Sequence, residues 1–209
     1  MIIDSGFLNE WQHKGHCYGE CMSHTLSDLM YVYIPKNASS WTKPNLKDWG
    51  WQFYNYRTDN LNKTAIVVLR DPVERWLSGI AEYFSLYHNH INVPNHNPNL
   101  LSIIFDKITF DDHTEKQVKF IHGLNTDECI FLWCDDRYGT NFSKLIQQHL
   151  GPNKYDQYEY QHVSEFDRNR RYYKTIFQKL LDDNPQYLEK VKQHFAEDYK
   201  LIKQVKFYG

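Results

Sequence analysis

The chain has little net charge and no long apolar run. Its 209 residues contain no stretch of about 18 apolar residues, so the sequence predicts no membrane-spanning helix. The formal net charge is −2 with histidine neutral, so the molecule as a whole has no positive field to attract nucleic acid or another polyanion. Any site for an anion must therefore be a local concentration of positive charge.

Cysteine is also scarce, with four residues that form no disulfide framework, which favours a reducing compartment. Residues 1–6 lack the basic stretch followed by an apolar stretch that is typical of a signal peptide. We therefore expect a soluble or cytoplasmic protein. Metal binding near the N-terminus stays an alternative to a local turn or helix start, although no standard zinc spacing is matched there. The residues concerned are His13, His16, Cys17, Cys21 and His24.

The chain does contain an alternation of buried strands and amphipathic helices. Strands are predicted at residues 30–34, 64–70 and 129–133, with a looser pattern at 51–57. Helices are predicted from about residue 40, at 72–87, 114–122, 141–150, 167–182 and 185–203. This alternation predicts one α/β domain over residues 1–209, with a central parallel sheet flanked by helices on both faces. Residues 1–29 receive no assignment, Pro44 predicts a short or late first helix, and residues 88–99 are predicted to be a long loop.

Two segments combine a strand end, a polar loop and a helix start. The first is Ile34-Pro35-Lys36-Asn37-Ala38-Ser39-Ser40-Trp41. A loop of this kind directs backbone N–H groups and the positive end of a helix dipole toward one point, which suits an anion. The segment lacks the glycines and the Gly-Lys-Ser/Thr ending of a Walker A loop, which disfavours an ordinary ATPase.

The second segment runs from Ala65 through Arg70 to Ser78. Asp71 is a good helix N-cap and Pro72 a good first helical residue, so Arg70 lies at the end of a strand. An arginine fork and a hydroxyl suit a phosphate monoester. We expect Arg75, on the same helix, to be solvated or salt-bridged. Because ligands of open α/β sheets bind at the carboxyl ends of strands, the two segments together suggest a ligand with two anionic ends.

Both segments also have a purely structural interpretation. Lys36 and the two serines after it would cap a surface helix. Arg70 would pair with Asp71 or Glu74, and Ser78 would let its helix pack closely beside Gly79.

The two segments resemble the donor-binding motifs of sulfotransferases that use 3′-phosphoadenosine 5′-phosphosulfate (PAPS). Residues 34–41 resemble the 5′-phosphosulfate loop, and residues 67–78 resemble the 3′-phosphate motif. A weaker likeness, to the carbohydrate sulfotransferases of the chondroitin, dermatan and heparan kind, covers most of residues 30–209. It is carried by residues 112–121, 131–151, 161–164, 195–199 and 207–208.

This resemblance implies a P-loop-like sheet and transfer of a sulfuryl group from PAPS to a hydroxyl, with a saccharide as the expected acceptor. 3′,5′-Adenosine bisphosphate (PAP) would remain, and no metal would be needed. Lys36 would neutralise the bridging oxygen of the donor as it leaves, while Arg70, Ser78 and, on the donor side, Ser164 would contact the nucleotide. The 5′-phosphosulfate would be held by Lys36, Asn37, Ala38, Ser39, Ser40 and Trp41.

The sequence offers several candidates for the general base that takes the acceptor's proton. Related enzymes use a glutamate or histidine, often between the two motifs, but residues 42–69 contain neither. We favour His113, because an imidazole titrates near neutral pH and the surrounding segment is family-like. The alternative is that residues 112–115 only begin a helix, with Asp112 as its cap. Other candidates are Asp48, Asp59, Glu82, His88, His90, Asp112 and Glu115.

Two other functions stay open at this point. One is a Mg²⁺-dependent phosphotransferase with an irregular phosphate loop, and the other is a binding module that holds an anion without turnover. A basic patch near residue 170 is either a solvated face paired with Glu165 and Asp167 or a contact to the nucleotide or acceptor. Its members are Arg168, Arg170, Arg171 and Lys174.

Overall fold

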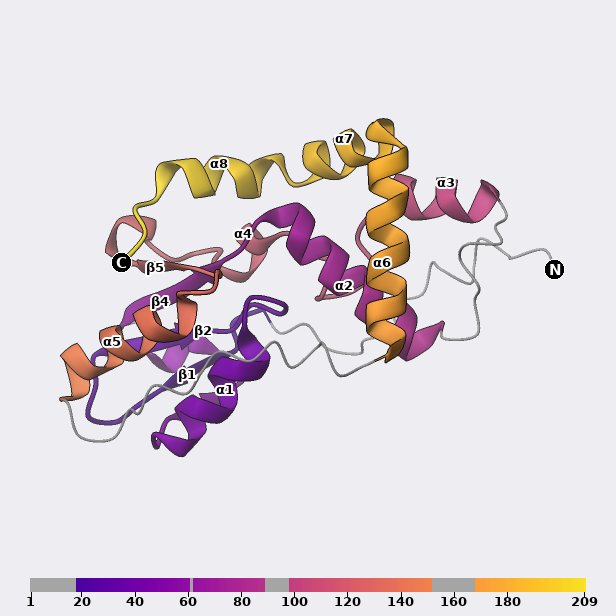
Figure 1. The fold of residues 1–209 in the computed structure, drawn as a ribbon. Helices are drawn as coiled ribbons and strands as arrows, with labels where there is room; N and C mark the ends of the chain where they lie inside the picture. The colour runs from indigo at the N-terminus through magenta and orange to yellow at the C-terminus, as the bar shows by residue number, and fades with distance from the viewer. Residues whose placement is uncertain (1–17, 61, 89–97, 152–167) are drawn as a thin grey trace. The chain divides into compact units, whose positions relative to one another are not determined.

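The computed structural model of the protein describes residues 18–60, 62–88, 98–151 and 168–209 (Figure 1). The chain divides into two compact units, and each is considered by itself. The sheet unit comprises residues 17–70, 117–163 and 200–209. The helical unit comprises residues 1–16, 71–116 and 164–199. The described residues form an α/β structure with one five-stranded mixed sheet and eight α-helices, so the predicted class is confirmed at that level.

The sheet has the strand order β3-β1-β2-β4-β5. Strands β2, β4 and β5 are parallel to one another, whereas β1 is antiparallel to both β2 and β3. The sheet is therefore mixed, whereas the sequence predicted a central parallel sheet. Only residues 24–28 join β1 to β2, and such a short connection permits a hairpin but not a parallel crossover. The strands are β1 Cys21–Ser23, β2 Leu29–Val32, β3 Gln52–Tyr54, β4 Thr64–Leu69 and β5 Ile130–Trp133.

Helices cover both faces of the sheet, as the sequence predicted. On β4, Ile66 and Val68 face one apolar cluster, whereas Val67 and Leu69 face another, because side chains alternate along a strand. The first cluster includes side chains of α1 (Ser39–Asp48) and α5 (Tyr138–Leu150). The second includes α4 (Gln117–Phe120) and Leu201 of α8 (Ala196–Gln204). Short 3₁₀ helices lie at η2 (Arg57–Asn60) and η4 (Thr126–Glu128).

Some helix boundaries differ from those expected. Pro44 lies inside α1, which is nevertheless ten residues long, so the helix is neither short nor late. The helix expected at 114–122 shrinks to the four residues of α4. The helix expected at 185–203 is divided into two helices, because the helical conformation is interrupted at the buried Phe195.

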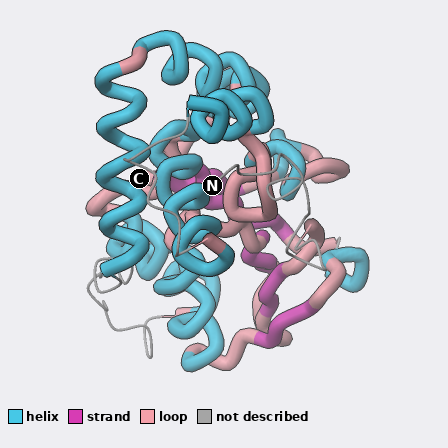
Figure 2. The backbone as a smooth tube through the Cα atoms, turned by 90° about the vertical axis from the view of Figure 1, so that its right-hand side faces the viewer, coloured by secondary structure: helices cyan, strands magenta, loops and turns pink. Residues whose placement is uncertain are grey.

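The helical unit has a core of its own, built on the apolar face of α2 (Pro72–Tyr87). The expected N-cap is confirmed, since the Asp71 carboxylate accepts a hydrogen bond of 2.9 Å from the backbone N–H of Glu74. Trp76 and Phe84 of α2 both contact Phe177 of α6 (Arg168–Asp183), with ring centroids 6.0 and 5.2 Å apart. The unit also contains α7 (Pro185–His194) and α3 (Pro98–Lys107), a helix that the sequence did not predict. In Figure 2 the strands are magenta and the helices cyan.

Within the described ranges, no helix is both long and apolar enough to cross a membrane. Cys21, Cys129 and Cys134 are free thiols. The loop expected at residues 88–99 lies mostly outside the described residues, and α3 begins near its end.

Candidate functional site

The loop between β2 and α1 has an unusual backbone. Lys36 and Ala38 both adopt left-handed conformations, with φ of 68° and 58°, although neither is glycine. Each such residue costs about 1–2 kcal/mol. Strain of this kind persists where the surrounding structure enforces it, and it concentrates at functional sites.

The start of α1 is not closed by a side chain. Its N-cap is Ala38, which makes no side-chain capping bond, and the first turn carries no acidic residue. Alanine is among the poorest N-cap residues, so the backbone leaves N–H groups at this helix end for another partner. Alternating backbone conformations of this type form concave nests of N–H groups that bind anions.

The Asn37 side chain attaches the loop to the neighbouring strand and helix. The residue is almost fully buried, and its side-chain Nδ2 donates to Val68 O on β4 at 2.6 Å and to Gln117 Oε1 on α4 at 2.7 Å. These bonds tie the loop to the neighbouring strand and to a helix on the other side of the sheet. Asn37 therefore has a structural role that explains how the strained loop is held.

Gln117 connects that loop to the end of β4. Its Oε1 also accepts from Arg70 N at 3.0 Å, and its Nε2 donates to Arg70 O at 2.9 Å. The Arg70 guanidinium in turn donates to Lys36 O at 3.4 Å. The structure therefore brings Lys36 and Arg70 together at the carboxyl edge of two adjacent parallel strands, β2 and β4. In open α/β sheets this edge is where ligands bind.

The remaining residues of the first motif divide into exposed and buried positions. Ser40 is exposed, while Ser39 is largely buried at the start of α1. The Trp41 ring is packed against Tyr138 and Phe142 of α5, with centroids 5.6 and 6.1 Å apart. Trp41 is thus a core residue that stabilises the base of the loop.

Ser78 and Ser164, two expected contacts to the donor, are not among the described residues of the sheet unit. Ser78 lies in the second turn of α2, within the helical unit, and is partly buried. Ser164 lies outside the described residues. Of the residues expected to hold the 3′-phosphate, Arg70 alone is therefore a described part of the sheet unit.

His113, in the helical unit, has a carboxylate near each ring nitrogen. Its Nδ1 lies 2.8 Å from Asp111 Oδ2, and its Nε2 lies 3.7 Å from Glu82 Oε1. Because an ionised carboxylate only accepts, the tautomer that bonds Asp111 carries its proton on Nδ1. Asp111 is fully buried, while the His113 side chain is 15% exposed. Residues 111–115 form a turn, not the start of a helix.

Two residues of α2 hold this turn in place. Arg75 is buried and donates to the carbonyls of Asp112, at 3.1 Å, and Glu115. The expectation of a solvated Arg75 is therefore wrong, because the carbonyls of the turn replace water as partners of its guanidinium. Gly79 touches the same turn: a Cβ there would lie 2.1 Å from His113 O. The sequence pattern of α2 alone does not show that Arg75 and Gly79 would contact the turn at residues 111–115.

The basic patch on α6 pairs with α2. Arg170 lies 3.3 Å from Glu82, and Lys174 lies 3.8 Å from Glu74. The partners expected from the sequence, Glu165 and Asp167, lie outside the described residues. Two members of the patch thus contribute to the packing of the helical unit.

The N-terminal histidine and cysteine cluster is described only in part. Cys21 is fully buried in β1, and the His24 ring lies 6.4 Å from the Trp51 ring. His13, His16 and Cys17 lie outside the described residues. Within the part of the chain that the structure describes, no three histidine, cysteine, aspartate or glutamate residues are grouped as metal ligands.

Comparisons with protein-family models, with curated proteins and with solved structures found no match to this chain. We therefore base the functional assignment on its own residues and on the likeness of its two strand–loop–helix segments.

Proposed function

We propose that the protein is a sulfotransferase that moves a sulfuryl group from PAPS to a hydroxyl of a saccharide. The observation that carries this proposal is the strained, uncapped loop of Lys36 and Ala38 joined through Gln117 to Arg70. An anion cradle and two cations at one strand edge suit a donor whose two ends are both anionic.

In this proposal the backbone of residues 36–40 binds the 5′-phosphosulfate, and the Lys36 ammonium neutralises the oxygen that leaves sulfur. Electrostatic stabilisation of a developing anion by one fixed donor is commonly worth about 3–4 kcal/mol. Arg70 and Ser78 would contact the 3′-phosphate. The parallel strands β2, β4 and β5 would then correspond to a P-loop-like core within a single functional domain.

His113 is our proposed general base. With its Nδ1 proton directed to Asp111, Nε2, which lies 3.7 Å from Glu82 Oε1, would accept the proton of the acceptor hydroxyl. The Asp111 carboxylate would fix the ring orientation and stabilise the positive charge that forms on it. Asp111 is thus a positioning residue in the proposal, in the sense that it acts through His113.

A transfer assay tests the proposal. The protein is incubated in EDTA with PAPS labelled in its sulfuryl group and with desulfated chondroitin, dermatan and heparan chains. We expect label in a saccharide product, reduced at least about 100-fold by Lys36→Ala and by His113→Ala. Lys47→Ala, at the exposed end of α1, is the matched control and should leave transfer unchanged.

Other outcomes separate the alternatives. Transfer of the γ-phosphate of ATP that requires Mg²⁺, with no transfer from PAPS, would establish the phosphotransferase. Binding of PAP without any transfer would identify a non-catalytic anion-binding module.

A further inference from the structure

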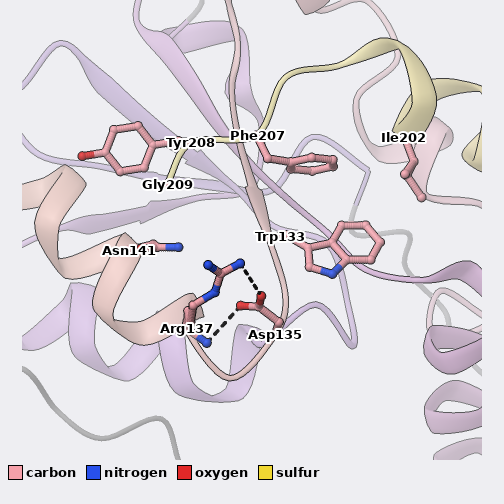
Figure 3. Close-up of a pocket in the computed structure, with 8 residues that line it drawn as sticks. All are labelled: Trp133, Asp135, Arg137, Asn141, Ile202, Phe207, Tyr208 and Gly209. Atoms are coloured by element: carbon pink, nitrogen blue, oxygen red, sulfur yellow. Dashed lines mark hydrogen bonds and ion pairs between the residues drawn. The ribbon is translucent and has the colours of Figure 1, made fainter.

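A second feature of the sheet unit lies at the end of β5. Trp133, Ile202, Phe207 and Tyr208 line a pocket of about 340 Å³ together with the polar side chains of Asp135, Arg137 and Asn141 (Figure 3). This volume is near the lower end of the usual range for small-molecule sites, about 300–1,000 Å³. The pocket therefore has room for a ligand about the size of one or two rings.

The pocket is preformed by the C-terminal segment. Phe207 forms a parallel bridge with Phe131 of β5, and Tyr208 N donates to Phe131 O at 2.8 Å. The Tyr208 hydroxyl also donates to Gln148 Oε1 at 2.7 Å. The wall formed by Phe207 and Tyr208 is thus fixed to β5 before any ligand binds. Ligand binding therefore carries no entropy cost for ordering this segment.

The polar groups of the pocket have hydrogen-bonding capacity to spare. Among the described residues, the Arg137 guanidinium has one partner, Asp135 at 3.4 Å, and its side chain is 73% exposed. Within the same part of the chain, the Asn141 side-chain amide makes no hydrogen bond. Carboxylate, guanidinium and amide together offer donors and acceptors in several directions.

The aromatic groups decide which ligand fits. The rings of Trp133 and Phe207 lie edge to face, with centroids 5.2 Å apart and planes at 71°. Perpendicular rings form no parallel slot between them into which a planar nucleobase could slide. In Figure 3 these rings and Ile202 lie on one side of the pocket, and Arg137, Asn141 and the Tyr208 ring on the other. A puckered ring with an apolar C–H face and hydroxyls around its rim matches that division.

Position in the sheet links the pocket to the proposed donor site. Because β2, β4 and β5 are parallel, the ends that carry Lys36, Arg70 and Trp133 lie on the same edge of the sheet. Adjacent strands are about 4.8 Å apart, so two strand spacings separate β2 from β5, about 10 Å. A ligand bound at the end of β5 therefore lies at the same edge of the sheet as Lys36 and Arg70.

We propose that this pocket binds a pyranose ring of the acceptor saccharide. The binding of a pyranose follows from the pocket itself, whereas its role as acceptor rests on the proposed function. Asp135 and Asn141 would accept from ring hydroxyls, Arg137 would donate to hydroxyl or ring oxygens, and the Trp133 ring would contact the C–H face.

A titration followed by NMR tests the pocket without requiring turnover. The probes are the methyl pyranosides of glucose, galactose, N-acetylglucosamine, N-acetylgalactosamine and glucuronate, with adenosine as the planar comparison. The indole N–H signal of Trp133, identified by its loss in Trp133→Phe, is followed. We expect at least one pyranoside to shift it saturably, with a Kd of about 1–10 mM.

Variants show whether the lining residues are responsible. Arg137→Ala and Asn141→Ala should each weaken that Kd at least about fivefold, whereas Lys144→Ala, exposed on the same helix, should not change it. Melting temperatures close to wild type establish that the variants fold. The proposal is overturned if no pyranoside shifts the signal, if only adenosine does, or if the pocket variants bind like the control.

Binding of PAP to the same samples separates the two proposals. A protein that binds PAP but no pyranoside contradicts the pocket alone. A protein that binds a pyranoside but not PAP supports the pocket and contradicts the donor site.

Discussion

Gln117 is the residue whose removal tests the connection between the two strand ends. Gln117→Leu keeps the approximate volume of the side chain but removes three hydrogen bonds, one to Asn37 and two to the backbone of Arg70. Each of these bonds, one buried and two partly buried, contributes about 1 kcal/mol, so we expect a loss of about 3 kcal/mol. For a chain of this length that loss lowers the melting temperature by about 6–12 °C.

The measurement is urea unfolding of the wild type and two variants, followed by titration with PAP. Gln148→Leu is the control, since it removes one exposed bond in the same unit and should cost less than about 0.5 kcal/mol. We also expect Gln117→Leu to weaken PAP binding, because the loop and Arg70 lose their common support. Equal stability of the two variants, with unchanged PAP affinity, would refute the reasoning.

Three further predictions concern single side chains. Gly79→Ala should destabilise the protein by about 1–3 kcal/mol in urea unfolding, because the new Cβ would meet His113 O at 2.1 Å; a loss below about 0.5 kcal/mol would contradict that contact. Ala38→Gly should be neutral or stabilise by up to about 1 kcal/mol, since glycine adopts the φ of 58° without strain; clear destabilisation would show that the loop is not strained there. Burial lowers the pKa of His194 from its ordinary 6.5, so the unfolded chain binds the proton first and stability declines as pH falls below about 6.5 toward the folded-state pKa. Unfolding measured across that range should show a flatter pH dependence in His194→Gln than in wild type, and parallel curves would count against this assignment.

The sequence predicted those elements that carry strong local signals. The buried strand ending at Leu69 and the helix from Pro72 to Tyr87 are confirmed, because a run of β-branched residues, an N-cap and an N1 proline all agree there. β1 was missed since three residues are too few to show a period, and its antiparallel pairing depends on a partner strand. α3 was missed because residues 100–113 received no assignment, and the predicted loop overlaps only its first two residues.

The candidate site shows the same division between local and long-range information. The positions of Lys36 and Arg70 at strand ends follow from local pattern. The joining of their loops through Gln117 does not, because these residues are 81 and 47 positions away from it along the chain, by their numbers. Asp111 and Arg75 were likewise not singled out as supports of His113 and its turn, since nothing in the sequence marks which polar residues become buried together.

The most direct test of the donor site is calorimetric titration of PAP into wild type and Arg70→Ala, each with EDTA and with Mg²⁺. At about 100 times its Kd, a ligand that binds only the folded protein adds about 2.7 kcal/mol of stability, so thermal unfolding of the same samples provides a second readout. We expect binding in wild type that does not depend on metal and that weakens at least about tenfold in Arg70→Ala. Absence of binding at millimolar PAP, or binding that requires Mg²⁺, would contradict the sulfotransferase assignment.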